Sequence, residues 1–302
     1  MGRRKNGQYL FYIALLVAAI AIIFFIQRYR TLEGFQEGPI KSITINLLGG
    51  LGNQIFIYAG GLTLKDKHKT ELFLLPVSDN TNIHSSRDYR FLFSKATPIE
   101  YDDPHMKDIR EVSIQNNFFG PWNSIPTDQN TNIFIHDHWF QDFPSIQSVI
   151  PQVKEELVGH LSELYNDVFI DKKSSAFIHV RRGDYVTVAS TYVLDMEYYQ
   201  PALAELNKFD SIKVIYIFSD DIEWCKQQKW ITNKQIKYID EPDELKTLYM
   251  MSQCEAGAVI ANSTFSSWGA FLGPYTSSAP VIYPSKWLYN GNLSLPTEWV
   301  QK

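Results

Sequence analysis

The sequence contains little cysteine: Cys225 and Cys254 are the only two among 302 residues. Small secreted domains that depend on disulfides carry more cysteine than this, so that class of protein is excluded. The two thiols are compatible with one disulfide or with two free, buried side chains, because the sequence does not reveal whether their Cα atoms approach each other.

The chain also lacks an excess of positive charge. It has 28 Lys and Arg against 33 Asp and Glu, a formal net charge of −5. Proteins that bind nucleic acids need a basic face, so we expect no nucleic-acid partner. Disorder is excluded by a composition that is 45% hydrophobic and 14% aromatic. The length favours one large domain or two packed lobes.

Only one long hydrophobic run is present, from residue 10 to residue 26. At about 1.5 Å per helical residue, this run crosses most of a bilayer core of roughly 30 Å. The basic stretch 3–5 precedes it and Arg28 and Arg30 follow, which favours a cytoplasmic N-terminus. A cleaved signal peptide is the alternative, but no small-residue cleavage site follows the run.

We therefore predict a single-pass membrane protein whose body lies on the lumenal or external side. The cytoplasmic tail comprises residues 1–8, the transmembrane anchor residues 9–27, and the stem residues 28–40.

From residue 41 onward, short apolar runs alternate with amphipathic stretches, which is typical of an α/β fold with parallel sheets. Residues 42–48 are predicted to form a strand, followed by a glycine turn and a helix over 53–67. A second helix is predicted over 151–165, because a proline suits its first turn. We place the lobe boundary there, which gives lobes 41–150 and 151–302. The stretch 77–143 is rich in Asn, Asp and Pro and is expected to be irregular.

The second lobe shows the clearest alternation. Its predicted strands are nearly continuous in hydrophobicity, as expected for strands covered on both faces of a doubly wound sheet. They are expected at 175–180, 212–218, 236–239, 256–260 and 281–283.

Three polar clusters in this lobe begin where a predicted strand ends. They comprise residues 181–184 (Arg-Arg-Gly-Asp), 219–221 (Ser-Asp-Asp) and 262–264 (Asn-Ser-Thr). Ligands of open parallel sheets bind outside the carboxyl ends of the strands. The three clusters are therefore expected to converge on one crevice.

The first cluster contains two arginines with different expected directions. Alternation along an extended chain places His179 and Arg181 on one side and Arg182 on the other. A guanidinium matches phosphate oxygens, and a fixed cation stabilises a leaving diphosphate in the transition state. The alternatives are an Arg–Asp pair that ties a loop together and an adhesion-type Arg-Gly-Asp tripeptide.

The other two clusters suit the same anionic ligand. A helix after the third cluster would begin at Asn262, Ser263 or Thr264 and offer its N–H groups to an anion; an ordinary helix cap is the alternative. Asp220 or Asp221 would accept hydrogen bonds from a base or sugar. Asp221-Ile222-Glu223 resembles a metal-binding sequence, but an acidic residue in a first helical turn is the commoner arrangement.

The glycine turn at 49–52 does not match a dinucleotide-binding fingerprint, because Ile55 occupies the position of the third glycine. We expect a tight turn that brings Asn53 and Gln54 into the crevice, with a plain strand-to-helix turn as the alternative. His136 and His138 lack a further Cys or His cluster nearby. Surface or substrate contacts are therefore favoured over a zinc site.

Four motifs in order carry a family resemblance: residues 47–62 (LLGGLGNQIFIYAGGL), 179–185 (HVRRGDY), 216–224 (YIFSDDIEW) and 243–273. Together they resemble glycosyltransferase family 11, the galactoside α-1,2-fucosyltransferases. The resemblance implies inverting transfer of fucose from GDP-fucose to a galactose-terminated glycan. It also implies a GT-B-like fold with two Rossmann-like lobes, no metal or other cofactor, and a type II membrane protein of the Golgi.

The resemblance and the residue patterns above together assign roles to individual residues. Arg181 would hold the donor diphosphate, and Asn53 would lie near the reaction centre. Asp184 is the nearest candidate base, and a dissociative mechanism without such a base is the alternative. The remaining donor-side residues are His179, Arg182, Gly183, Asp220, Asp221, Asn262, Ser263, Thr264 and Phe265, and the acceptor-side residues are Gly50, Gln54, His138 and Gln141.

Overall fold

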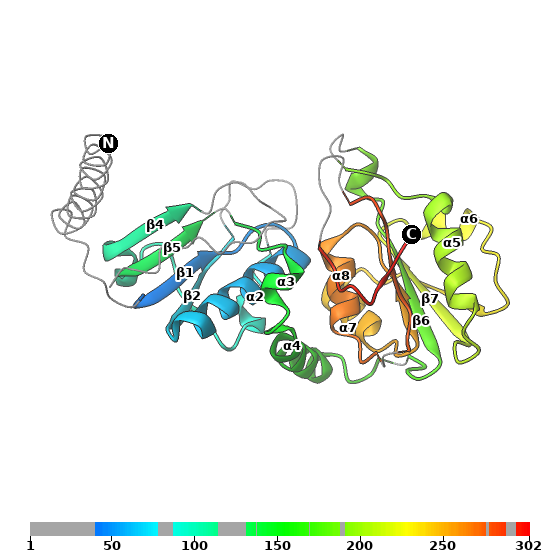
Figure 1. The fold of residues 1–302 in the computed structure, drawn as a ribbon, viewed down its shortest axis with the longest axis horizontal. Helices are drawn as coiled ribbons and strands as arrows, with labels where there is room; N and C mark the ends of the chain where they lie inside the picture. The colour runs from blue at the N-terminus through cyan, green and yellow to red at the C-terminus, as the bar shows by residue number, and fades with distance from the viewer. Residues whose placement is uncertain are drawn as a thin grey trace, which may run out of the picture.

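The computed structural model describes residues 40–77, 87–113, 131–136, 138–168, 170–187, 191–275, 278–287 and 294–302. These residues form two α/β lobes that lie side by side (Figure 1). Each lobe is built on one sheet, and all neighbouring strands in both sheets pair in parallel. The predicted α/β fold with a parallel sheet in each lobe is confirmed.

The sheet of the first lobe has the strand order β3-β2-β1-β5-β4. Helix α2 (Leu51–His68) follows β1 and begins two residues earlier than predicted, because Gly50 already takes the extended conformation of an N-cap. The strands are β1 (Ser42–Asn46), β2 (Glu71–Leu75), β3 (Thr97–Pro98), β4 (Ile109–Ser113) and β5 (Asn132–His136).

The expectation of an irregular stretch at 77–143 was wrong for part of its length, since β3, β4 and β5 lie within it. The short 3₁₀ helices η1 (Arg90–Leu92) and η2 (Pro104–Asp108) lie there too. Strand β4 forms an edge of the sheet and exposes Arg110 and Glu111, and both residues of β3 are exposed. Edge strands of this kind lack the continuous apolar run that identifies a buried strand.

The sheet of the second lobe has the order β11-β10-β9-β6-β7-β8. Its central strand β6 is buried at every position, as predicted. All five predicted strands are present, with ends shifted by at most two residues. They are β6 (Ser175–Val180), β7 (Val214–Ser219), β8 (Gln235–Ile239), β9 (Gly257–Val259) and β10 (Val281–Tyr283), with β11 (Val300–Gln301) added at the edge.

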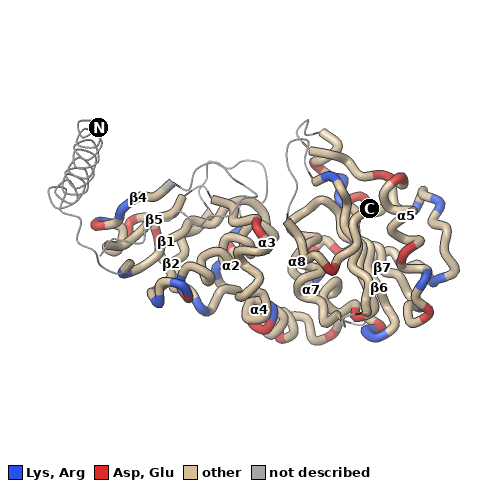
Figure 2. Tube along the Cα trace, in the orientation of Figure 1, with Lys and Arg blue, Asp and Glu red and all other residues tan. Residues whose placement is uncertain are grey.

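The helices of the second lobe cover its sheet on both sides (Figure 1). Strands β1, β6 and β7 contain no charged residue, and charges gather instead on loops and helices (Figure 2). The helices are α5 (Met196–Asn207), α6 (Ile222–Gln227), α7 (Glu244–Ser252) and α8 (Thr264–Phe271), with the short 3₁₀ helix η3 (Asp184–Val186) after β6.

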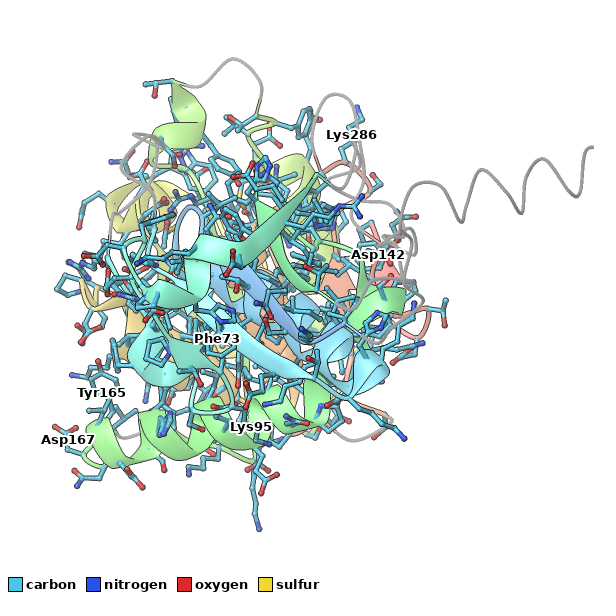
Figure 3. All side chains as sticks on the ribbon, turned by 90° about the vertical axis from the view of Figure 1, so that its left-hand side faces the viewer. Phe73, Lys95, Asp142, Tyr165, Asp167 and Lys286 are labelled. Atoms are coloured by element: carbon cyan, nitrogen blue, oxygen red, sulfur yellow. The ribbon has the colours of Figure 1, made fainter. Side chains whose placement is uncertain are left out.

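Helix α4 (Ile150–Leu164) lies below both lobes and bonds to each (Figure 1). Its Glu156 accepts a hydrogen bond of 2.6 Å from Tyr58 in the first lobe. Its Lys154 donates one of 2.6 Å to the carbonyl of Gly273 in the second. At its C-terminal end lies Tyr165, whose hydroxyl donates to Asp243 at 2.7 Å (Figure 3).

The two lobes meet where α2 packs on α8. A Cβ atom at Gly52 would lie 2.3 Å from the backbone nitrogen of Phe265, so only glycine permits this approach. Phe56 and Trp268 make an edge-on ring contact with centroids 5.2 Å apart. The short helix α3 (Phe143–Ile146) adds a stacked contact from Phe143 to Phe271. One hydrophobic core therefore runs through both lobes.

Cys225 and Cys254 are free and buried, which selects the second of the two alternatives left open by the sequence. Burial raises the pKa of the Cys225 thiol to about 11 and that of Cys254 to about 12. Over the described ranges, no helix has the length and apolar character to span a bilayer. The predicted tail, anchor and nearly all of the stem lie outside the described residues.

Candidate active site

A cavity of about 800 Å³ is lined by residues of both lobes. Its volume is in the range of small-molecule sites. The first lobe contributes the N-terminus of α2, and the second lobe contributes the carboxyl ends of its strands. The three polar clusters converge here as predicted, through Arg181, the segment 219–221 and the segment 263–265.

Arg181 follows β6 and is held from two sides. Its Nη1 lies 2.7 Å from Asp220 Oδ2, and its Nη2 lies 2.5 Å from Asp184 Oδ1. The guanidinium carbon lies 5.2 Å from the ring centroid of Tyr185, and the Nε atom is buried with no hydrogen-bond partner among the described residues. A guanidinium has five N–H donors, so three remain beyond the two ion pairs.

Arg182 points away from the cavity, as the alternation along the chain predicts. Its guanidinium lies 4.2 Å from the ring centroid of Trp224, and its Nε is 3.1 Å from Asp221. The backbone N–H of Arg182 donates to Asp220 at 2.8 Å. The two neighbouring arginines thus belong to different surroundings, and only Arg181 lines the cavity.

Asp221 caps helix α6, since its Oδ1 accepts the N–H of Trp224 at 3.1 Å. Glu223 lies in the first turn of that helix and pairs with Lys226, in agreement with the helical interpretation of this segment. Among the described residues, no group of three or more His, Cys, Asp or Glu side chains is arranged to hold a metal ion.

Asp184 and Gly183 lie beside Arg181 and outside the cavity lining. The carboxylate of Asp184 is tied to Arg181 in an i,i+3 ion pair. A Cβ atom at Gly183 would lie 2.5 Å from a carboxylate oxygen of Asp220, so a larger residue would displace that carboxylate. Both residues therefore support the position of Arg181.

Helix α8 starts at the cavity wall with Ser263 as its N-cap, one of the three predicted positions. Ser263, Thr264 and Phe265 line the cavity, where the first N–H groups of a helix attract anions. Asn262 is fully buried and donates to the carbonyls of Tyr192 and Trp287 at 2.7 and 3.0 Å. Asn262 thus anchors the loop behind the wall.

His179 lines the cavity although its side chain is buried. Burial is the main cause that lowers its pKa to about 4; nearby Asp220 opposes this effect and Arg181 adds to it. Its ring lies 5.5 Å from that of Phe265, and within the described part of the chain its Nδ1 has no hydrogen-bond partner. The imidazole is therefore neutral at neutral pH.

The first lobe contributes Asn53, which bridges to the second. Its Oδ1 accepts hydrogen bonds from Thr264 Oγ1 at 2.8 Å and from Gln141 Nε2 at 3.0 Å. Asn53, Gln141 and Gly50 line the cavity, as the sequence led us to expect.

Gln54 and His138 lie behind the wall. The buried Gln54 amide donates to the carbonyls of Gly49 and Arg87 at 2.9 and 3.0 Å. His138 is buried, and burial lowers its pKa to about 4. Its Nδ1 accepts the N–H of Phe140 at 3.1 Å, which places the ring proton on Nε2. Neither residue lines the cavity.

Residues 10–285 match the sequence profile of Glycosyl transferase family 11. The chain belongs to glycosyltransferase family 11. The O-antigen biosynthesis glycosyltransferase WbnK of Escherichia coli is 31% identical over 84% of this chain and 98% of its own length. The α-1,2-colitosyltransferase of Escherichia coli is 26% identical over 86% and 98%.

A relative from mouse, galactoside 2-alpha-L-fucosyltransferase Sec1, is 23% identical over 84% of this chain and 69% of its own length. Among solved structures, POFUT1 in complex with GDP aligns over 82% of this chain and 99% of that chain, with 11% identity and a TM-score of 0.49. That structural likeness is too distant to indicate a substrate.

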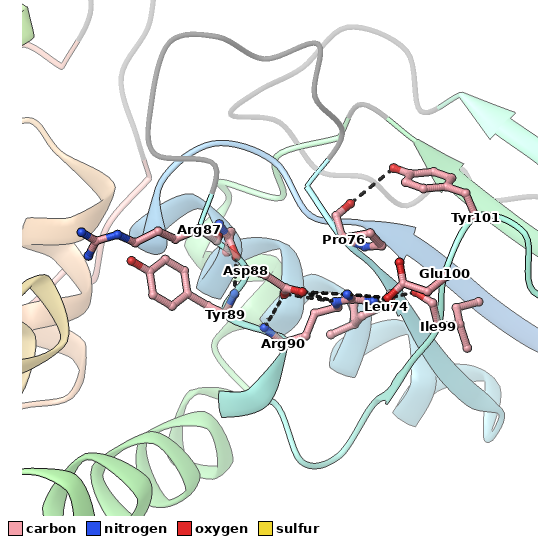
Figure 4. Close-up of polar contacts among 10 residues, drawn as sticks. Leu74, Pro76, Arg87, Asp88, Tyr89, Arg90, Ile99, Glu100 and Tyr101 are labelled. Carbon is pink, nitrogen blue, oxygen red and sulfur yellow. Dashed lines mark hydrogen bonds and ion pairs between the residues drawn. The ribbon is translucent and has the colours of Figure 1, made fainter.

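One contact between the lobes of this glycosyltransferase, at the cavity, was not predicted from the sequence. Arg87 and Tyr89 extend from the first lobe toward the second, whereas Arg90 turns back to Asp88 and Glu100 (Figure 4). Arg87 Nη1 lies 3.4 Å from Glu244 Oε1, and the hydroxyl of Tyr89 donates to the same oxygen. No motif surrounds Arg87, and Glu244 is 157 residues away, so the sequence holds no signal for this contact.

Proposed function

We propose that this family 11 glycosyltransferase moves fucose from GDP-fucose to the 2-hydroxyl of a terminal galactoside, with inversion at the anomeric carbon. The observation that carries the proposal is the placement of Arg181 beside the N-terminus of α8 in one cavity. The name of the mouse relative supports both fucose as the sugar and a galactoside as the acceptor. The α-1,2 linkage in the name of the colitosyltransferase supports the same linkage.

The proposed chemistry centres on the departing diphosphate. The bond between fucose C1 and the β-phosphate oxygen breaks with its electron pair going to GDP. The acceptor oxygen forms the new bond to C1, and its hydroxyl proton is released to solvent. Asp184 and Asp220 hold the Arg181 guanidinium in place before the reaction, so it needs no reorientation as charge develops. The N–H groups at the start of α8 act on the same charge.

We assign Asp184 to the positioning of Arg181 rather than to proton abstraction. Its carboxylate is paired with Arg181 and lies outside the cavity lining. This arrangement favours bond breaking ahead of attack, with leaving-group stabilisation as the main contribution. We also infer that catalysis needs no metal, since a fixed guanidinium and a helix N-terminus supply the positive charge at the diphosphate.

Asn53 is our candidate for orienting the acceptor hydroxyl. Two hydrogen bonds to its Oδ1 fix the side chain at the boundary between the lobes. An orienting group on the lobe opposite Arg181 would place the acceptor oxygen against the face of the sugar opposite to the departing diphosphate, as inversion requires.

The second candidate function is transfer of another GDP-linked sugar or formation of another linkage. The colitosyltransferase favours it, because at 26% identity it is more similar to this chain than the mouse fucosyltransferase at 23%. A competition between GDP-fucose and GDP-colitose for one acceptor distinguishes the two donors. A catalytically silent carbohydrate-binding protein has no comparable support.

The test uses the full chain in detergent with GDP-fucose, EDTA and a panel of galactose-terminated acceptors. We expect a fucosylated product whose α-1,2 linkage is read by NMR, and EDTA is expected to leave the rate unchanged. Absence of both product and GDP release across the panel would refute the transferase proposal. Loss of activity in EDTA that returns with a divalent ion would refute metal independence.

We further propose that the run at 10–26 anchors the body as a single-pass type II membrane protein. The Golgi is the expected compartment in a eukaryotic cell. Carbonate extraction and protease protection of the full chain test the anchor: the body must stay with the membrane and resist protease added on the cytoplasmic side.

A further inference from the structure

The nucleotide base of the donor needs a partner that Asp220 does not provide. Asp220 is paired with Arg181 itself, so a group bound to this carboxylate lies at the diphosphate end of the cavity. Asp221 sits on the neighbouring loop, where it caps α6 and pairs with Arg182. A base attached through a ribose must lie farther along the sheet.

The turn between β8 and α7 occupies that position. Strands β6, β7 and β8 are neighbours in the sheet, and adjacent strands lie about 4.8 Å apart, so the end of β8 is roughly 10 Å from the end of β6. Such a span accommodates a ribose between a diphosphate at Arg181 and a base at the turn. Here the cavity lining becomes partly apolar, through Phe218, Ile239 and Pro242. These side chains offer a flat base an apolar surface.

Three carboxylates of this turn and of the start of α7 line the cavity, and they differ in what they can accept. Asp240 is exposed to solvent. Glu244 uses a single oxygen, Oε1, for both Arg87 and Tyr89. Among the described residues, each oxygen of Glu241 has one donor: the N–H of Asp243 at 3.1 Å on Oε1 and Lys246 Nζ at 3.1 Å on Oε2.

This arrangement makes Glu241 a bidentate acceptor. The two donors fix the carboxylate, whose side chain is only 20% exposed. A carboxylate has about four lone-pair sites, so each oxygen of Glu241 retains one for a ligand. The two carboxylate oxygens are therefore suited to two N–H donors that lie side by side on a ligand.

We propose that Glu241 recognises the base of the donor and selects guanine, an inference that rests on the proposed function. Guanine presents N1–H and N2–H side by side, matched to the two carboxylate oxygens. Adenine presents a lone pair at N1 between its neighbours, and uracil flanks its single N–H with two carbonyl oxygens, so each faces the carboxylate with an unpaired acceptor. Hypoxanthine retains N1–H but lacks the N2 amine.

The test is titration calorimetry of the full chain with GDP, IDP, XDP and ADP. The wild-type chain is expected to bind IDP about 10- to 100-fold more weakly than GDP, the usual effect of one lost hydrogen bond to a charged group. In Glu241→Gln the amide oxygen still accepts N1–H, while the amide NH₂ now meets guanine N2–H but matches the O2 acceptor of xanthine. The preference should therefore invert to XDP over GDP.

Glu241→Ala provides a second measurement that does not depend on overall affinity. It should bind GDP and IDP equally, because the group that distinguishes them is gone. The matched control is Glu223→Gln, the same chemical change on another carboxylate of the cavity lining, 72% exposed and paired with Lys226. It should keep the wild-type order of nucleotides.

The outcomes separate this inference from the proposed function. If the wild-type chain binds GDP and transfers fucose but Glu241→Gln keeps its preference for GDP over XDP, Glu241 does not read the base. A preference for XDP over GDP that arises in Glu223→Gln or in Glu244→Gln instead would also overturn the assignment. If the wild-type chain binds no GDP at all, the proposed function fails together with the inference.

Discussion

The two lobes share an architecture, but they present different chemistry to the cavity between them. Both are parallel sheets covered by helices, and in both the lining residues follow the carboxyl ends of strands. Among the described lining residues, the first lobe offers amides, glycines and one charged side chain, Arg87. The second lobe offers Arg181, Asp220, Asp221, Glu223, Asp240, Glu241 and Glu244.

This difference matches the two substrates that we propose. A nucleotide sugar carries charge and many donors, so its lobe needs a fixed cation and carboxylate acceptors. An acceptor hydroxyl is neutral, and amides at fixed positions orient it without adding charge next to the diphosphate. Substitutions on either side of the cavity test this division of roles.

The largest expected effect comes from Arg181→Lys. A lysine keeps the charge but cannot span Asp184, Asp220 and a diphosphate at once, because an ammonium is a point charge rather than a planar fork. We expect kcat to fall about 10³-fold, or roughly 4 kcal/mol. Steady-state kinetics with GDP-fucose measures it. Arg182→Lys, outside the cavity, is the control and should keep most of the turnover; equal losses in both variants would argue against a specific role of Arg181.

Asn53→Asp places a negative charge on the first lobe, whose lining contains no carboxylate among the described residues. The carboxylate still accepts the hydrogen bonds of Thr264 and Gln141, so the geometry is preserved while a negative charge faces the donor. We expect kcat/KM for GDP-fucose to fall by roughly 100-fold, because a like charge a few ångströms away costs a few kcal/mol in a partly buried site. Asn132→Asp, on β5, makes the same change outside the cavity lining. Unchanged kinetics in Asn53→Asp would mean that the first lobe tolerates charge.

The second lobe was predictable because its strands are buried on both faces, so β6 and β7 appear in the sequence as apolar runs that end in polar clusters. The first lobe was less predictable from the sequence. Strand β4 exposes two adjacent charged residues, Arg110 and Glu111, at a sheet edge, and this composition resembles that of a loop. The contact of Arg87 with Glu244 depends on how the two lobes pack, and no local pattern encodes such a pairing. Gln54 was identified as important but placed wrongly in space, since sequence spacing does not distinguish the cavity wall from the layer behind it.

Gly52→Ala tests the close approach of the lobes. The added Cβ would lie 2.3 Å from the nitrogen of Phe265 and 2.6 Å from the carbonyl carbon of Thr264, both backbone atoms that cannot turn aside. We expect a loss of about 2 kcal/mol in unfolding free energy and a lower kcat, since Asn53 and Thr264 separate. Chemical denaturation and kinetics measure the two effects. A stable, fully active variant would show that the lobes do not meet this closely.

His138→Asn probes a buried neutral group of the first lobe. The unfolded imidazole binds a proton near its ordinary pKa of 6.5, whereas the folded one does so only near pH 4, so the unfolded state holds more protons between these values. Stability contributed by the neutral ring is therefore present above pH 6.5 and is lost as pH falls toward 4. Between pH 7 and pH 5 the wild-type chain should lose roughly 2 kcal/mol more than the variant. Denaturant titrations at both pH values measure this difference, and His160→Asn, the same substitution in helix α4, is the control. An identical pH dependence of the unfolding free energy in wild type and His138→Asn would contradict a buried neutral ring.

Gly159→Ala is the counterpart of Gly52→Ala and has the smallest expected effect, with the opposite sign. Gly159 lies in α4, and a Cβ atom added there would have no described residue within 4 Å. Alanine restricts the unfolded chain and favours the helix, which is worth about 0.5 to 1 kcal/mol at an exposed position. The melting temperature should rise by a few degrees while kcat and KM stay unchanged. A fall in melting temperature would mean that helix α4, which bonds to both lobes, is not continuous at residue 159. A thermal scan of Gly52→Ala completes the comparison: if only that variant loses stability, an added methyl group is destabilising at the lobe boundary and not in α4.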